Sequence, residues 1–288
     1  MDNIVFGIVT GSIILLGAVG FSMTLKAENF INIAHGQMLL LGAYITLFLN
    51  QYLGLLIAAP LSILLVGFMG VAIYRCFYRP VKSKGIMVLL FTSVGLSYAI
   101  NGIVGAVAGT KTYAYDIPNV RAFLIGGEPL ITPYELAIVI AAVCSALGLH
   151  FFLVKTKIGK AIRAVAENYD LSRVRGINTV RTSNYVWFIA SCFAGLAGVF
   201  SGVIGSLHLG LGWYQILIIL SATVLGGLGS IYGVMLAAVI IGLSMELSVL
   251  IIPSYYRTAI AFVFIIIVLL IKPDGLQSLW TKSSKRVA

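Results

Sequence analysis

The chain has 288 residues, of which 60% are hydrophobic and only 10% are charged, and its formal net charge is +10. Soluble domains carry about 25% charged residues, so this chain has too little polar surface to cover a globule in water. The composition therefore excludes an ordinary soluble protein and makes lipid the solvent for much of the chain.

Nine apolar segments follow one another along the chain, each approaching the length of about 20 residues that a membrane-spanning helix needs. In chain order they are residues 4–25, 33–49, 55–74, 86–108, 134–154, 184–206, 209–227, 231–252 and 257–271. Two of them, 33–49 and 209–227, are short or interrupted by glycine, which predicts a broken or re-entrant helix. We expect one all-α polytopic membrane domain over residues 1–288, with eight or nine transmembrane or re-entrant helices. The chain opens on Asp2 without a cleavage pattern, so we expect the first segment to remain as a helix.

Positive charge is clustered between these segments. All but four of the 19 Lys and Arg residues fall in residues 75–84, 155–181 and 272–286. Basic loops stay on the cytoplasmic side of a membrane, so we expect these three stretches to face the cytoplasm. Anionic lipid headgroups then account for the basic excess without any nucleic acid. Counting segments from these loops places the N-terminus and residues 109–133 outside, and the C-terminus inside.

Segment 184–206 carries a small residue at every fourth position. These residues are Ala190, Ala194, Gly198, Gly202 and Ser206. In lipid such a face lets helix backbones approach closely, and we expect it to serve packing within the chain.

Two segments begin with small or polar residues in apolar surroundings. Transporters often place such helix starts beside the substrate path, because the first N–H groups of a helix have no partner within it. The candidate path or gating residues at these starts are Asn32, His35, Gly36, Gly226, Gly227, Gly229 and Ser230.

Glu246 is the one acidic residue deep within an apolar segment. A lone carboxylate there is costly, so it should face a cavity or a partner, and Arg257 at the start of the next segment is a candidate partner. Two interpretations stay open, namely a residue that lines or gates a path and an acid that pairs helices near the interface. Asn101 and Gln37 are weaker path candidates of the same kind.

The sequence offers no cluster suited to catalysis or metal binding. His35, His150 and His208 lie in different segments without a carboxylate at ligand spacing, which argues against a metal site. Ser206 lies close to His208, but the G-x-S-x-G elbow of a hydrolase is absent. The three cysteines show neither metal nor disulfide spacing. We therefore expect no catalytic residue, no metal and no cofactor in this chain.

The basic stretch 155–181 has a helical pattern of its own. Ile158, Ile162 and Val165 recur at helical spacing, whereas Arg163 points to another side. This pattern predicts an amphipathic helix parallel to the membrane surface. A surface helix that anchors the chain in lipid is one interpretation.

A second short helix is expected to follow, capped by Asp170 and running through Arg175, with Gly176 supplying a left-handed turn at its end. This two-piece design, with acids among the bases, favours a docking element for a soluble partner. The candidate docking residues are Arg163, Glu167, Asn168, Asp170, Arg173, Arg175 and Gly176.

Seven stretches, in order across nearly the whole chain, resemble the LIV-type permeases of the branched-chain amino acid and ribose importer group. They are residues 31–36 (INIAHG), 41–44 (LGAY), 78–81 (YRPV), 159–168 (GKAIRAVAEN), 175–177 (RGI), 224–230 (VLGGLGS) and 272–276 (KPDGL). The loop lacks the Ile-x-Leu-Pro ending of many other importers, and this group commonly lacks it too.

The resemblance implies a permease subunit of an ATP-binding cassette importer in a bacterial or archaeal cytoplasmic membrane. It also implies a second permease that forms the other half of the path, two ATPase subunits docked on the coupling loop 155–181, and an extracytoplasmic substrate-binding protein. ATP and Mg would be bound by the ATPases, since this chain has no G-x-x-x-x-G-K-[ST] loop. The group's usual substrates are leucine, isoleucine and valine, and relatives move other amino acids, urea or short amides.

Two other classes of function fit the sequence less well. A stand-alone secondary transporter or channel would need more intramembrane acids than Glu246 and gives no reason for a structured basic loop. A membrane enzyme would need a catalytic cluster, which the sequence lacks.

Overall fold

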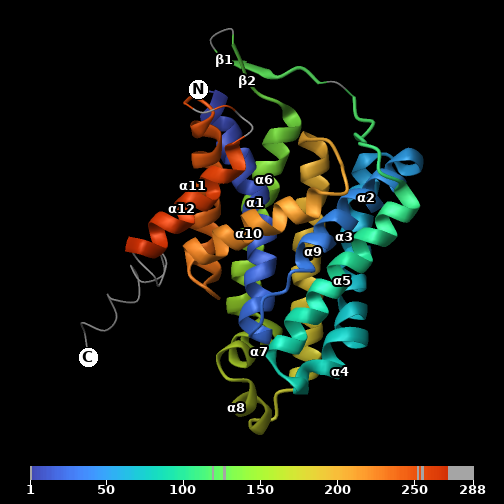
Figure 1. The fold of residues 1–288 in the computed structure, drawn as a ribbon, viewed down its shortest axis with the longest axis vertical. Helices are drawn as coiled ribbons and strands as arrows, with labels where there is room; N and C mark the ends of the chain where they lie inside the picture. The colour runs from blue at the N-terminus through green and yellow to red at the C-terminus, as the bar shows by residue number, and fades with distance from the viewer. Residues whose placement is uncertain (1, 119, 126–127, 252, 254–255, 272–288) are drawn as a thin grey trace.

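The computed structural model describes residues 2–118, 120–125, 128–251, 253 and 256–271. Helices dominate it (Figure 1), and the basic stretch 272–286 lies outside the described residues. The elements in chain order are α1 (Asp2–Glu28), α2 (His35–Leu53), α3 (Leu55–Ile73), the π-helical turn η1 (Tyr74–Tyr78), α4 (Arg79–Val81), the 3-10 turn η2 (Lys82–Lys84), α5 (Ile86–Ala108), β1 (Phe123–Ile125), β2 (Glu128–Ile131), α6 (Pro133–Lys155), α7 (Lys157–Glu167), α8 (Tyr169–Val174), α9 (Thr179–Ile204), α10 (Leu211–Gly226), α11 (Ile231–Ser248) and α12 (Arg257–Ile271).

Each of the nine predicted apolar segments falls on one helix, in order α1, α2, α3, α5, α6, α9, α10, α11 and α12. Among the described residues, six helical stretches are long and apolar enough to cross a membrane, and α10 is a shorter apolar helix. The predicted segment 231–252 is too long, since α11 ends at Ser248, and residue 252 lies outside the described residues. The antiparallel hairpin of β1 and β2 was not predicted.

The two ends of the bundle differ in charge. The basic stretches that hold η2 and α7–α8 lie together at one end, which we call the basic end (Figure 1). The Lys82 ammonium lies 4.3 Å from the centroid of the Tyr169 ring, which joins the two stretches directly. The β1–β2 hairpin and the start of α1 lie at the opposite end, the hairpin end.

The segment between α5 and α6 crosses the hairpin end and is fastened to the bundle. Tyr113 pairs with Leu207 through two backbone hydrogen bonds of 2.9 and 2.7 Å. The Tyr115 hydroxyl donates to the carbonyl oxygen of Ala43 at 2.8 Å. Burial raises the pKa of Tyr115, so this phenol keeps its proton and remains a donor. Residues 113–115 therefore form a fixed cover over α2 and the end of α9.

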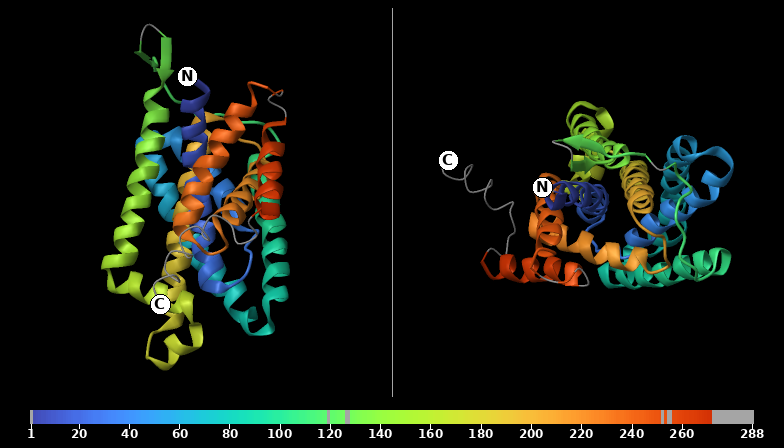
Figure 2. Two further views of the ribbon diagram at one scale, coloured as in Figure 1. Left: turned by 90° about the vertical axis from the view of Figure 1, so that its left-hand side faces the viewer. Right: turned by 90° about the horizontal axis from the view of Figure 1, so that it is seen from above.

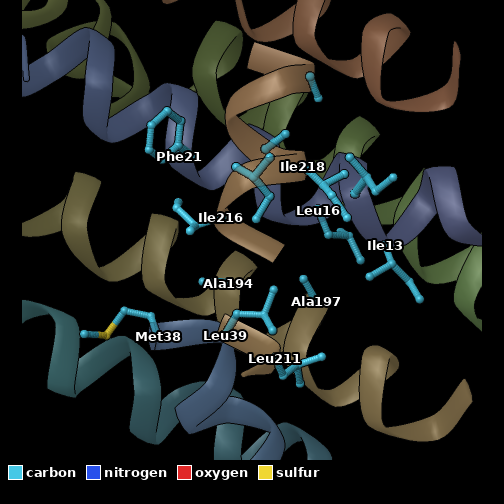
Figure 3. Packing of buried hydrophobic residues seen from close by; sticks show 14 of the residues in the cluster. Ile13, Leu16, Phe21, Met38, Leu39, Ala194, Ala197, Leu211, Ile216 and Ile218 are labelled. Carbon is cyan, nitrogen blue, oxygen red and sulfur yellow. The ribbon is translucent and has the colours of Figure 1, made fainter. Parts of the chain in front are cut away.

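Helix α1 runs through the middle of the bundle, next to α6, α9, α10 and α11 (Figure 2). Its side chains Leu16 and Phe21 belong to one buried cluster with Ile216 of α10 and Leu39 of α2 (Figure 3). Close packing of such apolar side chains holds the helices together through dispersion contacts, the main attraction between helices in lipid.

The small residues of α9 serve this packing, as predicted. Ala190 and Ala194 are fully buried, and a Cβ on Gly198 would overlap the carbonyl oxygen of Leu39 in α2. The exception is Ser206, which lies beyond the end of α9 and is exposed. The face therefore brings α9 against its own chain's α2.

Gly198→Ala is expected to lower stability, because the backbone of α2 leaves no room for a methyl group and overpacking costs about 1–3 kcal/mol. The measurement is the thermal unfolding midpoint of the purified protein in mild detergent. Gly148→Ala is the matched control, since a Cβ at Gly148 on α6 meets open space and alanine favours helix by about 1 kcal/mol. Equal midpoints for the two variants would contradict the close packing of α9 on α2.

Candidate functional site

The connection between α1 and α2 is an interruption that leads back into the bundle. Helix α1 ends at Glu28 near the basic end, and Asn29 takes a left-handed conformation with φ 56°. Residues 29–34 then return the chain to the middle of α1, where the ring of His35 lies 2.9 Å from the carbonyl oxygen of Gly17. Helix α2 therefore starts inside the molecule, as its polar and small residues predicted.

A second interruption meets the first. After α9, residues 205–210 lead into α10, whose start lies directly against the start of α2. A Cβ on Gly36 would overlap the carbonyl oxygen of Gly212, and a Cβ on Gly212 would lie 2.8 Å from the Gln37 side-chain oxygen. Glycine at both positions is what allows two helix starts to approach this closely.

Polar side chains gather where these helix starts meet. The Asn101 amide on α5 donates to the Gln37 side-chain oxygen at 3.3 Å and to the carbonyl oxygen of Leu209 at 2.8 Å. Gln37 is fully buried, and its Nε2 has no hydrogen-bond partner among the described residues. We call Gly36, Gln37, Asn101 and Gly212 the polar crossing. Three of these four residues were path candidates from the sequence, and Gly212 was missed.

Asn32, which precedes the crossing in the chain, is held by residues that the sequence analysis did not single out. The Tyr78 hydroxyl donates to Asn32 Oδ1 at 2.8 Å, and the Ile33 N–H donates to the Ser93 hydroxyl at 3.3 Å. Both Tyr78 and Ser93 are buried. The interruption 29–34 is thus held in place by η1 and α5, a tertiary arrangement that leaves no local pattern in the sequence.

The glycine cluster before α11 has different surroundings. Gly227 and Gly229 adopt φ values of 98° and 81°, and the Ser230 side chain caps α11 by accepting from the Gly233 N–H at 3.2 Å. Gly226 packs against Gly233. The structure therefore places these candidates in the turn between α10 and α11 and does not bring them to the polar crossing.

Glu246 is a link between three helices. Its carboxylate accepts from the Thr10 hydroxyl of α1 at 3.0 Å and lies 3.0 Å from the Arg257 guanidinium of α12. The predicted partner Arg257 is confirmed. Because the side chain is only 8% exposed and both contacts are to neighbouring helices, the geometry favours the helix-pairing interpretation.

Helix α7 rests on the bundle through its apolar face. Ile162 belongs to a buried cluster that includes Met23 of α1, Leu153 of α6 and Val186 of α9, and Val165 on the same face is also buried. The predicted amphipathic helix is confirmed, but its apolar face packs on protein, and the interpretation as a lipid-anchored helix is not supported. A push on α7 would therefore act on three membrane-spanning helices at once.

Helix α8 begins differently from the prediction. Its N-cap is Asn168, whose extended backbone lets the side chain accept from the Leu171 N–H at 2.9 Å. The predicted cap, Asp170, is wrong because that residue already lies inside the first turn, where its charge only complements the helix dipole. The predicted left-handed turn is confirmed, since Gly176 has φ 81° and the Ile177 N–H donates to Ser172 O at 3.0 Å.

The α7–α8 element presents its polar residues to solvent at the extreme basic end (Figure 1). Two apolar side chains of α8 that the sequence reasoning missed, Leu171 and Val174, are 48% and 85% exposed. A groove of about 340 Å³ lies between α7 and α9, with Lys157 and Arg181 among its lining residues. All seven predicted docking residues are exposed, namely Arg163, Glu167, Asn168, Asp170, Arg173, Arg175 and Gly176.

The histidines lie apart, each with a different neighbour. His35 contacts α1 as described, His150 lies 2.7 Å from the Tyr232 hydroxyl, and His208 packs edge-on against Tyr214. Within the described ranges no three His, Cys, Asp or Glu residues are grouped so that they could hold a metal ion.

The fold is that of a multi-pass helical membrane protein with two interrupted helices and a structured basic loop. The family model described as the branched-chain amino acid transport system permease component matches residues 3–270. The chain belongs to this family, and it is a permease subunit of an ATP-binding cassette transporter in the cytoplasmic membrane.

Individual relatives agree along nearly the whole chain. The high-affinity branched-chain amino acid transport system permease protein LivH of Escherichia coli is 29% identical, covering 94% of this chain and 92% of the relative. BraD of Pseudomonas aeruginosa, with the same description, is 28% identical over 96% of this chain and 95% of its own length. A structure of PsaBC from Streptococcus pneumoniae in complex with Fab shares the fold, with a TM-score of 0.52, 14% identity, and coverage of 95% of this chain and 91% of that one.

Asn168→Ala is expected to loosen α8, because losing an N-cap costs about 1 kcal/mol. The measurement is hydrogen exchange of the amides in residues 170–176, which should become roughly fivefold faster for that cost. Asp170→Ala is the matched comparison and should have the smaller effect, since a first-turn charge contributes about 0.3–1 kcal/mol. A larger effect from Asp170→Ala would restore Asp170 as the cap.

Proposed function

We propose that this chain forms one half of the translocation path of an importer for branched-chain or other hydrophobic amino acids. A second permease of the same kind, identical or different, forms the other half. Two ATPase subunits drive the transporter, and an extracytoplasmic binding protein delivers the substrate. The observation that carries the proposal is the exposed α7–α8 element, which is supported by helices α1, α6 and α9.

The proposed orientation follows from charge. Since basic loops are retained on the cytoplasmic side, the basic end faces the cytoplasm and the hairpin end faces outward. The start of α1 then lies outside, and the C-terminus, which lies beyond the described residues, is expected inside. This orientation puts α8 where a soluble ATPase can reach it.

The exposed surface of α8 suits a protein partner. Arg173 and Arg175 present positive charge beside the apolar side chains of Leu171 and Val174, a combination of apolar anchor and charged rim that protein interfaces use. ATP and Mg belong to the ATPase subunits in this proposal, and the permease binds neither.

The polar crossing is the proposed path or gate. Gln37 and Asn101 supply amide groups, and the starts of α2 and α10 supply helix N-termini that favour a carboxylate. His35 and Asn32 fix the start of α2 to α1 and η1, so they act on the crossing by position. We propose that the turn between α10 and α11 is a hinge, formed by Gly226, Gly227, Gly229 and Ser230. Glu246 is proposed to hold α11 to α1 and α12 near the hairpin end.

The substrate class rests on the relatives, whose names specify branched-chain amino acid transport. Urea, short amides or other amino acids are the alternative cargoes of the wider group. No residue at the crossing selects among them by itself, so we propose that the binding protein carries most of the selectivity. Binding assays on that protein with a panel of amino acids and amides would decide the cargo.

The double variant Arg173→Glu with Arg175→Glu is expected to lose the ATPase subunits. The two glutamates would face an ATPase surface that is proposed to match positive charge, and like charges placed across an interface cost several kcal/mol. The measurement is the amount of ATPase that copurifies with the tagged permease in mild detergent, together with ATP-driven uptake in proteoliposomes. Arg121→Glu is the control, since Arg121 is exposed at the hairpin end. Full ATPase recovery and normal uptake in the double variant would contradict docking at α8.

A further inference from the structure

Four elements meet around one lysine at the basic end. The Lys82 ammonium of η2 lies 2.5 Å from the Glu28 carboxylate at the end of α1. The same ammonium lies 4.3 Å from the centroid of the Tyr169 ring, at the first residue of α8. The Thr179 hydroxyl, at the start of α9, donates to the Tyr169 hydroxyl at 3.1 Å. We call Glu28, Lys82 and Tyr169 the lysine joint.

The two contacts of Lys82 differ in how easily they can be broken. The Glu28 side chain is 2% exposed, and among the described residues its Oε1 has no hydrogen-bond partner. A buried carboxylate that lost its counter-charge would be left uncompensated, so Lys82 and Glu28 must move together. The contact with the half-buried Tyr169 ring is a cation–π interaction, which is weaker at exposed sites. Helix α8 can therefore make or release its contact while α1 and η2 stay joined.

The joint lies directly before the interruption that leads to the polar crossing. Glu28 is the last residue of α1, and residues 29–34 follow it. Tyr78, one turn before Lys82, donates to Asn32 within that interruption. The segment from η1 to η2 therefore holds two residues of this region. Lys82 holds Glu28, directly before the interruption, and Tyr78 holds Asn32 within it.

We propose that the lysine joint couples movement of α8 to the interruption 29–34 and so to the start of α2. This inference rests on the proposed function, in which an ATPase moves α8. Displacement of Tyr169 changes the surroundings of Lys82, and the tightly paired Lys82 and Glu28 carry the change to α1 and η2. Glu28, Lys82 and Tyr169 are positioning residues, since they act on the path through residues 29–34 and touch no substrate.

The test uses the complete transporter in proteoliposomes, with partner permease, ATPases and loaded binding protein. Substrate uptake and ATP hydrolysis are measured in the same vesicles. Glu28→Gln and Lys82→Met should retain their ATPase subunits and hydrolyse ATP, but move roughly fivefold less substrate per ATP, the lower range of a typical coupling. The double variant should be no worse than either single one, because the two groups act as a unit.

Matched controls separate this effect from a general loss of charge. Lys84→Met removes an exposed lysine from the same turn, and Glu135→Gln neutralises a carboxylate in the capping box of α6 at the hairpin end, where glutamine is tolerated. Both should keep the normal ratio of substrate to ATP. Tyr169→Phe keeps the ring and should stay within about twofold of normal, whereas Tyr169→Leu should resemble Lys82→Met.

An unchanged ratio in Glu28→Gln and Lys82→Met would overturn the joint. If those variants fail to assemble, Tyr169→Leu decides, because its side chain is only half-buried, and an unchanged ratio there has the same consequence. Failure of the proposed function has a different signature, since the unaltered permease would then recover no ATPase and show no ATP-driven uptake.

Discussion

In the hydrocarbon core of a membrane no water is present to pair with backbone N–H and C=O groups, so a helix can be interrupted only where protein surrounds the break or where it lines a water-filled cavity. Two helices of this chain, α2 and α10, start inside the bundle. Their starts are enclosed by α1 and α5 and by each other, with Gly36 against Gly212. The close packing of α9 on α2 through Gly198, and the cover formed by residues 113–115, follow from the need to bury these two starts.

The same need connects the two proposed functional regions, the α7–α8 element and the polar crossing. Because the chain is interrupted before α2, the start of α2 can move as a unit. The position of this helix start depends on the contacts that hold residues 29–34 and their neighbours. Tyr78 of η1 and Ser93 of α5 hold Asn32 and Ile33, and Lys82 of η2 holds Glu28 directly before them. Helix α8 reaches this set through Tyr169. The proposed docking surface at the basic end and the polar crossing in the bundle are therefore linked by a short series of direct contacts.

The sequence predicted what depends on local pattern. The length of the apolar segments predicted the helices, and the clustered basic residues predicted that the loops between them share one end. The lone acidic residue Glu246 predicted an ion pair with Arg257. Other features depend on partners distant in the chain, such as the contact of Asn101 with Gln37. Residues 32–37 and 226–230 look alike in composition, yet only the first lies at the crossing, because composition does not specify depth in the bundle. Asn168 and Asp170 are both good caps, and backbone conformation decided between them.

The central claim is that α8 is the contact with the ATPase on the cytoplasmic side. A photoreactive amino acid placed at Val174, which is 85% exposed on α8, tests it most directly in cells that produce the whole transporter, with Val107, 84% exposed at the end of α5, as the reference position. The account predicts that irradiation joins this chain to the ATPase from position 174 and not from position 107. No ATPase adduct from position 174, or equal adducts from both positions, would contradict it.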